Sequence, residues 1–570
     1  MKYTHHMKVL AQYFSQHEET ETTIARLADI LNCSERHVKT IMNYLDKEGF
    51  VDWKTVRGRG KKPKLKLNYS LDAIRLNEAK EAIATENYRE GFRHAEKLPA
   101  ELQVAFQHWL QNHLGIVDSE EPLDILRYPF YETNLMMDPL HMISRHDAHM
   151  IQQIFDRLVE FDAATGKTFP KIAHHVESKD GMTWIFYLRK GVTFHHGKEL
   201  TSEDVKTTFS RFPKEDSLVK NIHSIECVSK YVVKFHLKQK DYLFPRYLTG
   251  TRASIVPADV IEKDEKEFGR FPVGSGPYQL TKHDADIVRL DVFKNYYGLR
   301  PWLDRIDIIK APSRFPLNPS HPLLLTAPDD SWKKVERMEE GADYIIFNCR
   351  KTGPVREKSF RKKLVQFIEP EKFCLPSEVV AHSFITERTK QLHPERKKPV
   401  EATPAFDGEL LIAAQQIREG VNHKREADIL KGQLEAAGIR AKVEIVPTSE
   451  WWNSETYEKY DLFVAGVGLA EDLFLSLLNL LQSKRMAIEP SLPEEMREFL
   501  TEKLTLIRET QTDKERWRLY FEIEDRLKSE YAILFLSHRS HTVYEQKDSA
   551  YVNIELDSYG RVDYRKVWKR

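Results

Sequence analysis

The most restrictive feature of the sequence is a change of hydrophobic period at Gly49. Before this glycine, residues 34–48 carry apolar side chains at the spacing of one buried helix face: Val38, Ile41, Met42 and Leu45. After it, residues 50–56 alternate apolar and polar side chains as a strand does, and residues 64–69 alternate again. The glycine- and proline-containing segment 58–63 predicts a turn between the two strands. A helix that ends at a glycine and runs directly into a hairpin therefore dominates the first seventy residues.

A second, shorter helix is predicted directly before the first one. Residues 23–31 place Ile24, Leu27 and Leu31 on one face, residues 32–33 form a turn, and Ser34 is a good N-cap for the next helix. Two helices joined by a short turn, with a hairpin after the second, indicate a winged helix-turn-helix.

The exposed face of the second helix carries the side chains that read and grip nucleic acid. At 100° per residue, the face opposite the buried stripe holds Arg36, Thr40, Asn43 and Lys47, with Lys39 on its flank. Such side chains reach base edges and phosphates. The alternative is an ordinary amphipathic surface helix, and the helix alone does not decide between the two.

The hairpin concentrates positive charge. Residues 54–66 contain seven lysines and arginines and no acid, although the whole 570-residue chain has a formal net charge of zero. Residues 1–70 hold thirteen basic and eight acidic residues, a net charge of +5. A solvated loop is the alternative, but cations on a hairpin beside a polar helix face favour double-stranded DNA as a partner. The predicted contacts on the hairpin are Arg57, Arg59, Lys61 and Lys62.

Two further helices are predicted at residues 71–92 and 99–114, followed by a domain boundary at 118–122. They serve either as a spacer or as a dimerisation element, so a homodimer is one arrangement to test. We expect a winged helix at 1–70, a helical connector at 71–117 and a third part at 118–570.

Length and composition limit the protein class. A chain of 570 residues predicts several domains. Its N-terminus lacks the apolar stretch of a signal peptide, and the rest of the sequence contains no apolar run long enough to span a membrane. We therefore expect a cytoplasmic protein with no membrane partner. Cys33, Cys227, Cys349 and Cys374 are scattered, which favours reduced, buried thiols over a zinc site or disulfides.

From residue 123 the pattern becomes α/β, and no catalytic motif appears in it. There is no glycine-rich phosphate loop before a helix, no HExxH and no GxSxG. Adjacent histidines at 174–175 and 195–196 point to opposite faces of a strand, and His146 and His149 lack a third ligand. We expect no enzyme activity, no metal and no cofactor.

Three blocks carry a resemblance to a known family. The opening block 134–205, the block FPVGSGPYQL at 271–280 and the block at 343–368 resemble family 5 extracellular solute-binding proteins. The likeness covers most of 125–550 and is stronger in its first half. Ser275 stands where that family usually has threonine. Together with the recognition-helix and GRGK segments at 33–67, the combination resembles the SgrR-type transcriptional regulators.

The resemblance implies a multidomain protein: an N-terminal winged helix-turn-helix and a C-terminal, two-lobed α/β domain of the periplasmic-binding-protein type, class II. We expect a first lobe at about 118–312 plus the C-terminal part, and a second lobe at about 313–500. The residues 182–194 predict a hairpin in the core sheet of one lobe. Thr201 and Asp204 predict a capping box.

For the cleft, the resemblance implies a ligand contact at Asp472, with Glu471 beside it. An acid that only caps the following helix is the alternative. Trp451 and Trp452 are candidates for stacking on a ligand, or else belong to the core. The ligand class stays open between peptides, sugars and sugar phosphates.

The resemblance as a whole implies a regulator in which closure of the lobes on a solute alters DNA binding. The alternatives are a solute-binding, oligopeptide-type component of an ABC transporter and, with no supporting residues, a DNA-acting enzyme.

Overall fold

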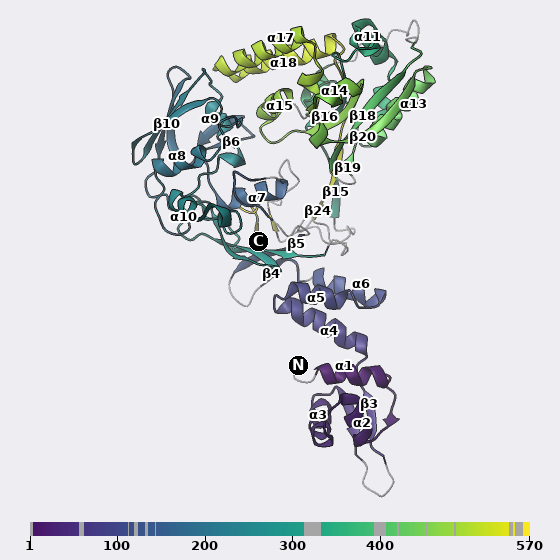
Figure 1. The fold of residues 1–570 in the computed structure, drawn as a ribbon. Coiled ribbons are helices and arrows are strands. Elements are labelled where there is room, and N and C mark those ends of the chain that lie inside the picture. The colour runs from purple at the N-terminus through teal and green to yellow at the C-terminus, as the bar shows by residue number, and fades with distance from the viewer. Residues whose placement is uncertain are drawn as a thin grey trace. The chain divides into compact units, whose positions relative to one another are not determined.

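The computed structural model consists of two compact units (Figure 1). One comprises Met1–Leu135, Tyr278–Val292 and Pro301–Ala327, and the other comprises Met136–Pro277, Phe293–Arg300 and Pro328–Arg570. The structure describes all residues except 1–3, 56–61, 112, 119–122, 131–134, 143, 313–331, 393–405, 419–420, 452, 484–485, 547–550, 553–562 and 570. The predicted contacts Arg57, Arg59, Lys61 and Trp452 lie outside the described residues.

The first unit begins with the predicted winged helix. Its elements are α1 (Thr4–Tyr13), β1 (Thr20–Glu21), α2 (Ile24–Leu31), α3 (Glu35–Lys47), β2 (Val51–Lys54) and β3 (Lys64–Leu67). Strands β2 and β3 are antiparallel, and β1 adds to the outer side of β3. The helix–turn–helix and the hairpin that follows it are therefore confirmed.

Local chemistry explains these boundaries. The side chain of Thr23 accepts a hydrogen bond from the Arg26 amide at the start of α2, and that of Ser34 accepts one from the His37 amide at the start of α3. Asn32 ends α2 in the left-handed conformation, at φ +49°. The predicted stripe of α3 is buried, with Leu27 and Leu31 of α2 packed in the same core.

The connector contains three helices where the sequence predicted two. They are α4 (Leu71–Ala84), α5 (Tyr88–Ala95) and α6 (Ala100–Gln111). The predicted single helix over 71–92 is wrong because the chain turns at Glu86, whose φ is +61°. The Asn87 amide then donates to the Ala82 carbonyl, and α5 folds back on α4.

Gly91 allows α5 to lie close to α4. A Cβ at this position would lie 2.7 Å from the Ile83 side chain and 3.0 Å from the Ala79 carbonyl oxygen. We expect Gly91→Ala to destabilise the α4–α5 pair by ~1–3 kcal/mol, through overpacking. Amide hydrogen exchange over residues 71–95 measures this. Gly432→Ala is the control, because a Cβ there meets nothing within 4 Å and alanine favours the helix; equal effects of the two changes would contradict the packing argument.

The connector packs on a five-stranded sheet of the same unit. Its strands are β4 (Gly115–Asp118), β5 (Asp124–Phe130), β12 (Tyr278–His283), β13 (Ile287–Val292) and β14 (Arg305–Lys310). Their order is β12-β13-β14-β5-β4, with β14 and β5 parallel. Ile287, Ile309 and Ala311 share one buried cluster with the apolar side chains of α4, α5 and α6. The connector is thus part of a folded body.

The second unit starts with a four-stranded antiparallel sheet of order β10-β11-β9-β8. The elements of this part are α7 (Arg145–Ile154), β6 (Val159–Asp162), β7 (Lys167–Pro170), β8 (Ala173–Glu177), β9 (Thr183–Leu188), α8 (Ser202–Ser210), β10 (Ile222–Ser229), β11 (Val232–Leu237), α9 (Phe244–Tyr247), η1 (Thr251–Ala253) and α10 (Ala258–Phe268). The hairpin predicted at 182–194 is wrong, because β9 pairs with β8 and β11 instead. The capping box of Thr201 and Asp204 is confirmed at the start of α8.

The glycines of the 271–280 motif permit a close backbone approach. A Cβ on Gly274 would lie 2.0 Å from the Ile154 carbonyl oxygen, and one on Gly276 would lie 2.6 Å from the Ile154 carbonyl carbon. The half-buried His195 ring is 3.0 Å from the Gly276 carbonyl oxygen and accepts from the Gly274 amide. Burial lowers the pKa of His195 to about 4, so the neutral ring holds this turn.

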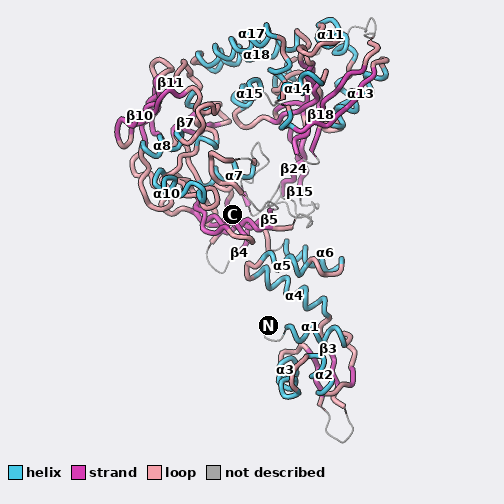
Figure 2. The backbone as a smooth tube through the Cα atoms, viewed as in Figure 1, coloured by secondary structure: helices cyan, strands magenta, loops and turns pink. Residues whose placement is uncertain are grey.

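The second part of this unit is built on a six-stranded sheet, with β20 paired to the outer side of β18 (Figure 2). The strands here are β15 (Trp332–Met338), β16 (Gly341–Phe347), β17 (Val379–Val380), β18 (Glu409–Arg418), β19 (Val421–Asn422), β20 (Arg440–Pro447), β21 (Leu462–Gly468), β22 (Ile533–Phe535), β23 (Ser537–His538), β24 (Ser540–Gln546), β25 (Tyr551–Val552) and β26 (Trp568–Lys569). The helices are η2 (Pro354–Arg356), α11 (Lys358–Phe367), η3 (Pro370–Phe373), α12 (Thr386–Gln391), α13 (Lys424–Ala436), η4 (Thr448–Glu450), α14 (Ser454–Lys459), α15 (Leu473–Gln482), α16 (Ile488–Ser491), α17 (Glu494–Glu509) and α18 (Asp513–Ser529).

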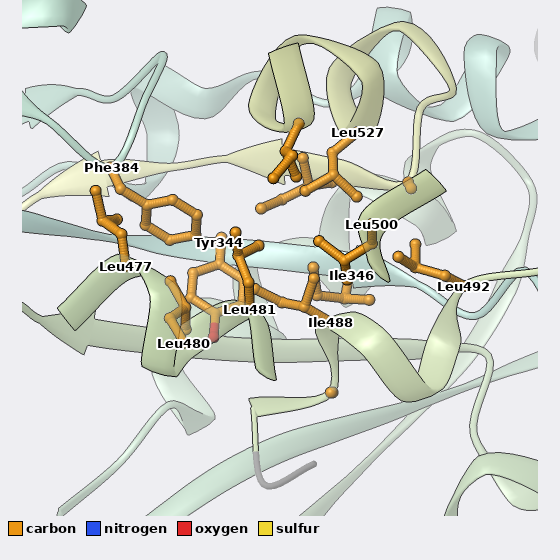
Figure 3. Close-up of a cluster of buried hydrophobic side chains, with 14 of the residues drawn as sticks. Tyr344, Ile346, Phe384, Leu477, Leu480, Leu481, Ile488, Leu492, Leu500 and Leu527 are labelled. Atoms are coloured by element: carbon orange, nitrogen blue, oxygen red, sulfur yellow. The ribbon is translucent and has the colours of Figure 1, made fainter. Parts of the chain in front are cut away.

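The largest core lies between β16 and these helices. Figure 3 shows Tyr344 and Ile346 of β16 among side chains of α15, α16, α17 and α18, and all of them are buried. No helix in the described ranges is long and apolar enough to cross a membrane.

Candidate nucleic-acid interface and ligand cavity

The predicted DNA-contacting side chains of α3 form one exposed face. Arg36, Lys39, Thr40, Asn43 and Lys47 are all exposed, because the stripe between them is buried. Within the described part of the chain, neither Arg36 nor Lys39 nor Lys47 has an ion-pair partner. The geometry is that of a helix face ready to enter a groove, and the individual contacts stay predictions.

The hairpin carries less free positive charge than the sequence indicated. Lys54 and Lys64 both form ion pairs with Glu19, at 3.0 and 2.7 Å. Lys66 pairs with Asp52 at 3.7 Å. Lys62 is exposed, and no ion pair to it is found among the described residues. Lys62, the one predicted hairpin contact within the described residues, is therefore exposed to solvent.

A backbone contact fixes the hairpin to the recognition helix. The carboxylate of Asp46, near the end of α3, accepts a hydrogen bond from the Trp53 amide of β2 at 2.7 Å. The Asn68 side chain donates to the Gly49 carbonyl at 3.0 Å. Helix and hairpin are thus held at a defined distance from one another.

Helix α4 joins the winged helix to the connector. Ile74 at its start belongs to the winged-helix core, whereas Ala79 and Ile83 belong to the core beneath the connector. Glu78, between them, pairs with Lys8 of α1 at 2.6 Å. One continuous helix therefore contributes to both cores.

A cluster of charges ties the connector to the sheet. Arg289 of β13 donates to Glu86 at 2.6 Å and to Asp307 of β14 at 2.6 Å. Arg127 of β5 donates to Asp307 from the other side at 3.3 Å. The Asp307 side chain is 0 % exposed, and the two guanidinium groups balance the charges of the two carboxylates, Asp307 and Glu86. The Arg89 amide adds a hydrogen bond to Asp286 at 2.5 Å.

The second unit contains a cavity of about 850 Å³. Its walls come from distant segments, and they include Arg157, Phe161, Thr251, Glu471, Asp472 and Arg565. A cavity of this size accommodates a small solute. A second cavity of about 680 Å³ adjoins it through shared lining residues, among them Thr251 and Asn479.

The predicted ligand contact Asp472 lines the larger cavity, but its carboxylate is occupied. It caps α15 by accepting from the Leu475 amide at 2.9 Å, and it accepts two hydrogen bonds from Arg246, at 2.5 and 2.7 Å. The Arg246 guanidinium lies over the Phe161 and Phe474 rings. The alternative role of Asp472 as a helix-capping acid is thus present in the structure. Its neighbour Glu471 is exposed and also lines the cavity.

Trp451 belongs to the core. Its side chain is 0 % exposed and its ring packs on Phe463, with ring centroids 5.2 Å apart. Of the two alternatives that the sequence left open for Trp451, stacking on a ligand or a place in the core, the structure has the second. We therefore leave Trp451 out of the proposed ligand site.

Sequence reasoning missed the charged walls of the cavity. Arg157 donates to Glu160 at 3.3 Å, and Arg565 donates to Asp563 at 2.8 Å. Arg246 pairs with an acid more than two hundred residues away. No local pattern links Arg246 to Asp472, and the short-range pairs of Arg157 and Arg565 do not by themselves indicate a cavity, so the sequence held no signal for these walls.

Two family models match the chain. Residues 2–119 match the model described as "Sugar transport-related sRNA regulator N-term", and residues 167–314 match "Bacterial extracellular solute-binding proteins, family 5 Middle". The "HTH-type transcriptional regulator SgrR" of Yersinia pseudotuberculosis is 25% identical over 561 residues, which cover 97% of this chain and 96% of the relative. The protein of the same description from Yersinia enterocolitica is 27% identical over 444 residues, 76% of this chain and 77% of that one.

Over nearly its whole length the chain is similar to SgrR-type transcriptional regulators. Solved structures show the fold of the chain's larger part. "HbpA2 from Haemophilus parasuis" aligns with a TM-score of 0.61 at 18% identity, over 78% of this chain and 100% of that chain. The "dipeptide binding protein from pseudoalteromonas sp. SM9913 in complex with Met-Leu" aligns with a TM-score of 0.60 at 18% identity, over the same shares. The multidomain, two-lobed family 5 fold expected from the sequence is confirmed.

Proposed function

We propose that this regulator binds double-stranded DNA through the exposed face of α3 and the hairpin, and that a small solute bound in the 850 Å³ cavity alters its DNA affinity by closing the two lobes. The observation that carries the proposal is the exposed cationic face of α3, whose Arg36, Lys39 and Lys47 have no ion-pair partner among the described residues. Helix α4 joins this winged helix to the connector core. The proposed site of action is the cytoplasm, and no intrinsic turnover is expected. Delivery of a solute to a transporter, the alternative, would leave the winged helix without a role.

The proposed domain limits are 1–70, 71–117 and 118–570. For the solute, the proposal favours Glu471 as a contact, because this carboxylate is exposed in the cavity whereas that of Asp472 is held by Arg246. Peptides, sugars and sugar phosphates all stay candidates. A homodimer is tested by light scattering of the full chain.

The DNA part is tested by selection of duplexes from a random-sequence pool with the full chain. Arg36→Ala and Asn43→Ala are each expected to weaken binding to the selected duplex by ~1–3 kcal/mol and to relax base preference at one position. Lys62→Ala is expected to weaken binding to all duplexes and to lower the salt slope by about 0.9.

The control for these variants is Arg93→Ala, which removes an exposed arginine of α5 away from α3. Anisotropy titrations compare the four variants with wild type on selected and scrambled duplexes. If Arg36→Ala and Asn43→Ala match Arg93→Ala on both duplexes, α3 is not the reading element.

The solute part is tested by a thermal-shift screen of the full chain with peptides, sugars and sugar phosphates. A compound at 100 times its Kd should add about 2.7 kcal/mol of stability. A compound that binds wild type should lose affinity for Glu471→Gln. The control is Glu489→Gln, a change outside the cavity lining.

A further inference from the structure

The base of the hairpin places two like charges directly opposite each other. Lys54 and Lys64 are partners in the β2–β3 ladder, at the end of the described pairing. Cβ atoms of such partners lie ~4.5–5.5 Å apart, and like charges there destabilise the pair. Without a third group, this charge pair would push the two strands apart.

Glu19 supplies that group. One carboxylate oxygen accepts from Lys64 at 2.7 Å, and the other accepts from Lys54 at 3.0 Å. These two hydrogen bonds, the one from Lys64 first, lower the pKa of Glu19 to about 2. The carboxylate therefore stays ionised at any pH used for DNA binding.

The backbone holds Glu19 in this place. Glu19 directly precedes β1, and in that strand Thr20 pairs with Leu65 and Glu21 with Lys64. The side chain of Glu19 thus starts from a strand already hydrogen-bonded to β3. On the other side of the hairpin, β2 is held to α3 through Asp46. The bridge by Glu19 completes the support of the hairpin base.

We infer that Glu19 is a positioning residue of the DNA interface and that it raises sequence specificity. It acts in two ways: it occupies two lysines that would otherwise attract any phosphate, and it keeps the two strands of the hairpin together beside the recognition helix. The inference rests on the proposed DNA-binding function. It names the residue that restrains sequence-independent attraction at that site.

The test compares Glu19→Gln with wild type in the full chain, on a duplex selected by wild type and on its scrambled version, over a series of KCl concentrations. The variant frees two lysines, so the salt slope on the scrambled duplex should steepen by up to about 1.8. Affinity for the scrambled duplex should rise about tenfold, and the ratio of selected to scrambled affinity should fall.

Glu21→Gln is the matched control. It removes the same charge two residues away. Glu21 faces Lys64 in the β1–β3 ladder, but in the described part of the chain it forms no ion pair with Lys54 or Lys64. A slope and a ratio equal to those of Glu21→Gln would overturn the inference. Failure of wild type itself to bind DNA would instead overturn the proposed function, and the inference with it.

The double variant Glu19→Gln with Lys64→Gln tests whether Glu19 acts through the two lysines. It restores the net charge of the hairpin base, so its salt slope should return toward that of wild type. It also removes the repulsion between Lys54 and Lys64, so its ratio of selected to scrambled affinity should rise above that of Glu19→Gln. A ratio as low as that of Glu19→Gln would contradict this role of Glu19, and the double variant also reports on Glu19 if the single variant fails to fold.

Discussion

Arg289→Ala is expected to destabilise the first unit by about 3–5 kcal/mol, because it leaves the fully buried carboxylate of Asp307 with Arg127 alone. Asp307 cannot exchange its lost partner for water, since its side chain is 0 % exposed. The same change removes the hydrogen bond from the sheet to Glu86 at the turn between α4 and α5. The loss should therefore appear in the connector as well as in the sheet.

Arg305→Ala is the control for this prediction. Arg305 lies on β14 of the same sheet and pairs with Asp291 at 2.6 Å, but both side chains are partly exposed to solvent. Such a pair contributes ~0–1 kcal/mol. Hydrogen exchange over residues 71–111 and 278–310 measures both variants, and equal protection in the two would contradict the proposed importance of the buried cluster.

The second large effect is the influence of the solute on DNA affinity. A solute shifts the balance of open and closed lobes only by its difference in affinity for the two states. Coupling energies between sites are typically ~1–3 kcal/mol, which corresponds to a 5- to 150-fold change in DNA affinity. We expect a change in this range when a compound found by the thermal-shift screen saturates the full chain.

The connector decides how this coupling is tested. A flexible linker would transmit little of the effect of solute binding to the winged helix. Helix α4 is not such a linker, because it contributes both to the winged-helix core and to the core on the sheet. The chain also passes between the two units at Pro277–Tyr278 and Val292–Phe293, on either side of β12 and β13. The sheet that holds the connector is thus covalently continuous with the second unit.

Glu86→Gln should reduce the coupling while each binding activity persists. The change removes the charged partner of Arg289 and Lys282 at the connector turn but leaves the Arg289–Asp307 pair in place. Glu90→Gln is the control, because Glu90 pairs within α5 and not with the sheet. Anisotropy titrations of the selected duplex, with and without the compound, give the coupling for each protein. A full solute effect in Glu86→Gln would mean that this contact does not transmit it.

The winged helix could be predicted from the sequence because its signals are local. Ser34 caps the helix that it precedes, the apolar stripe of α3 repeats within four residues, and the hairpin alternates on either side of its turn. The exposed face of α3 follows directly from the buried one. Each of these features depends on residues that are close together in the sequence, so a single sequence is enough to predict them.

Other features depend on contacts between distant residues. The break at Glu86 is stabilised by Arg289, about two hundred positions away, and the helical pattern runs through it without a proline. The seven cations of 54–66 suggested an unpaired patch, yet Glu19 forms ion pairs with two of them from 35 and 45 positions away. The cavity walls come from segments far apart in the chain, so sequence reasoning reached Glu471 and Asp472 through a resemblance. It missed the lining residues Arg157 and Arg565, and also Arg246, which binds the Asp472 carboxylate.

The central claim is that the solute cavity and the DNA-binding face are energetically coupled, and reciprocity gives its most direct test. Calorimetry should titrate the compound from the thermal-shift screen into the full chain, once alone and once with the selected duplex bound. Because coupling is reciprocal, DNA should change the solute affinity by the same factor by which the solute changes the DNA affinity, within the 5- to 150-fold range. Identical solute affinities with and without DNA would contradict the claim.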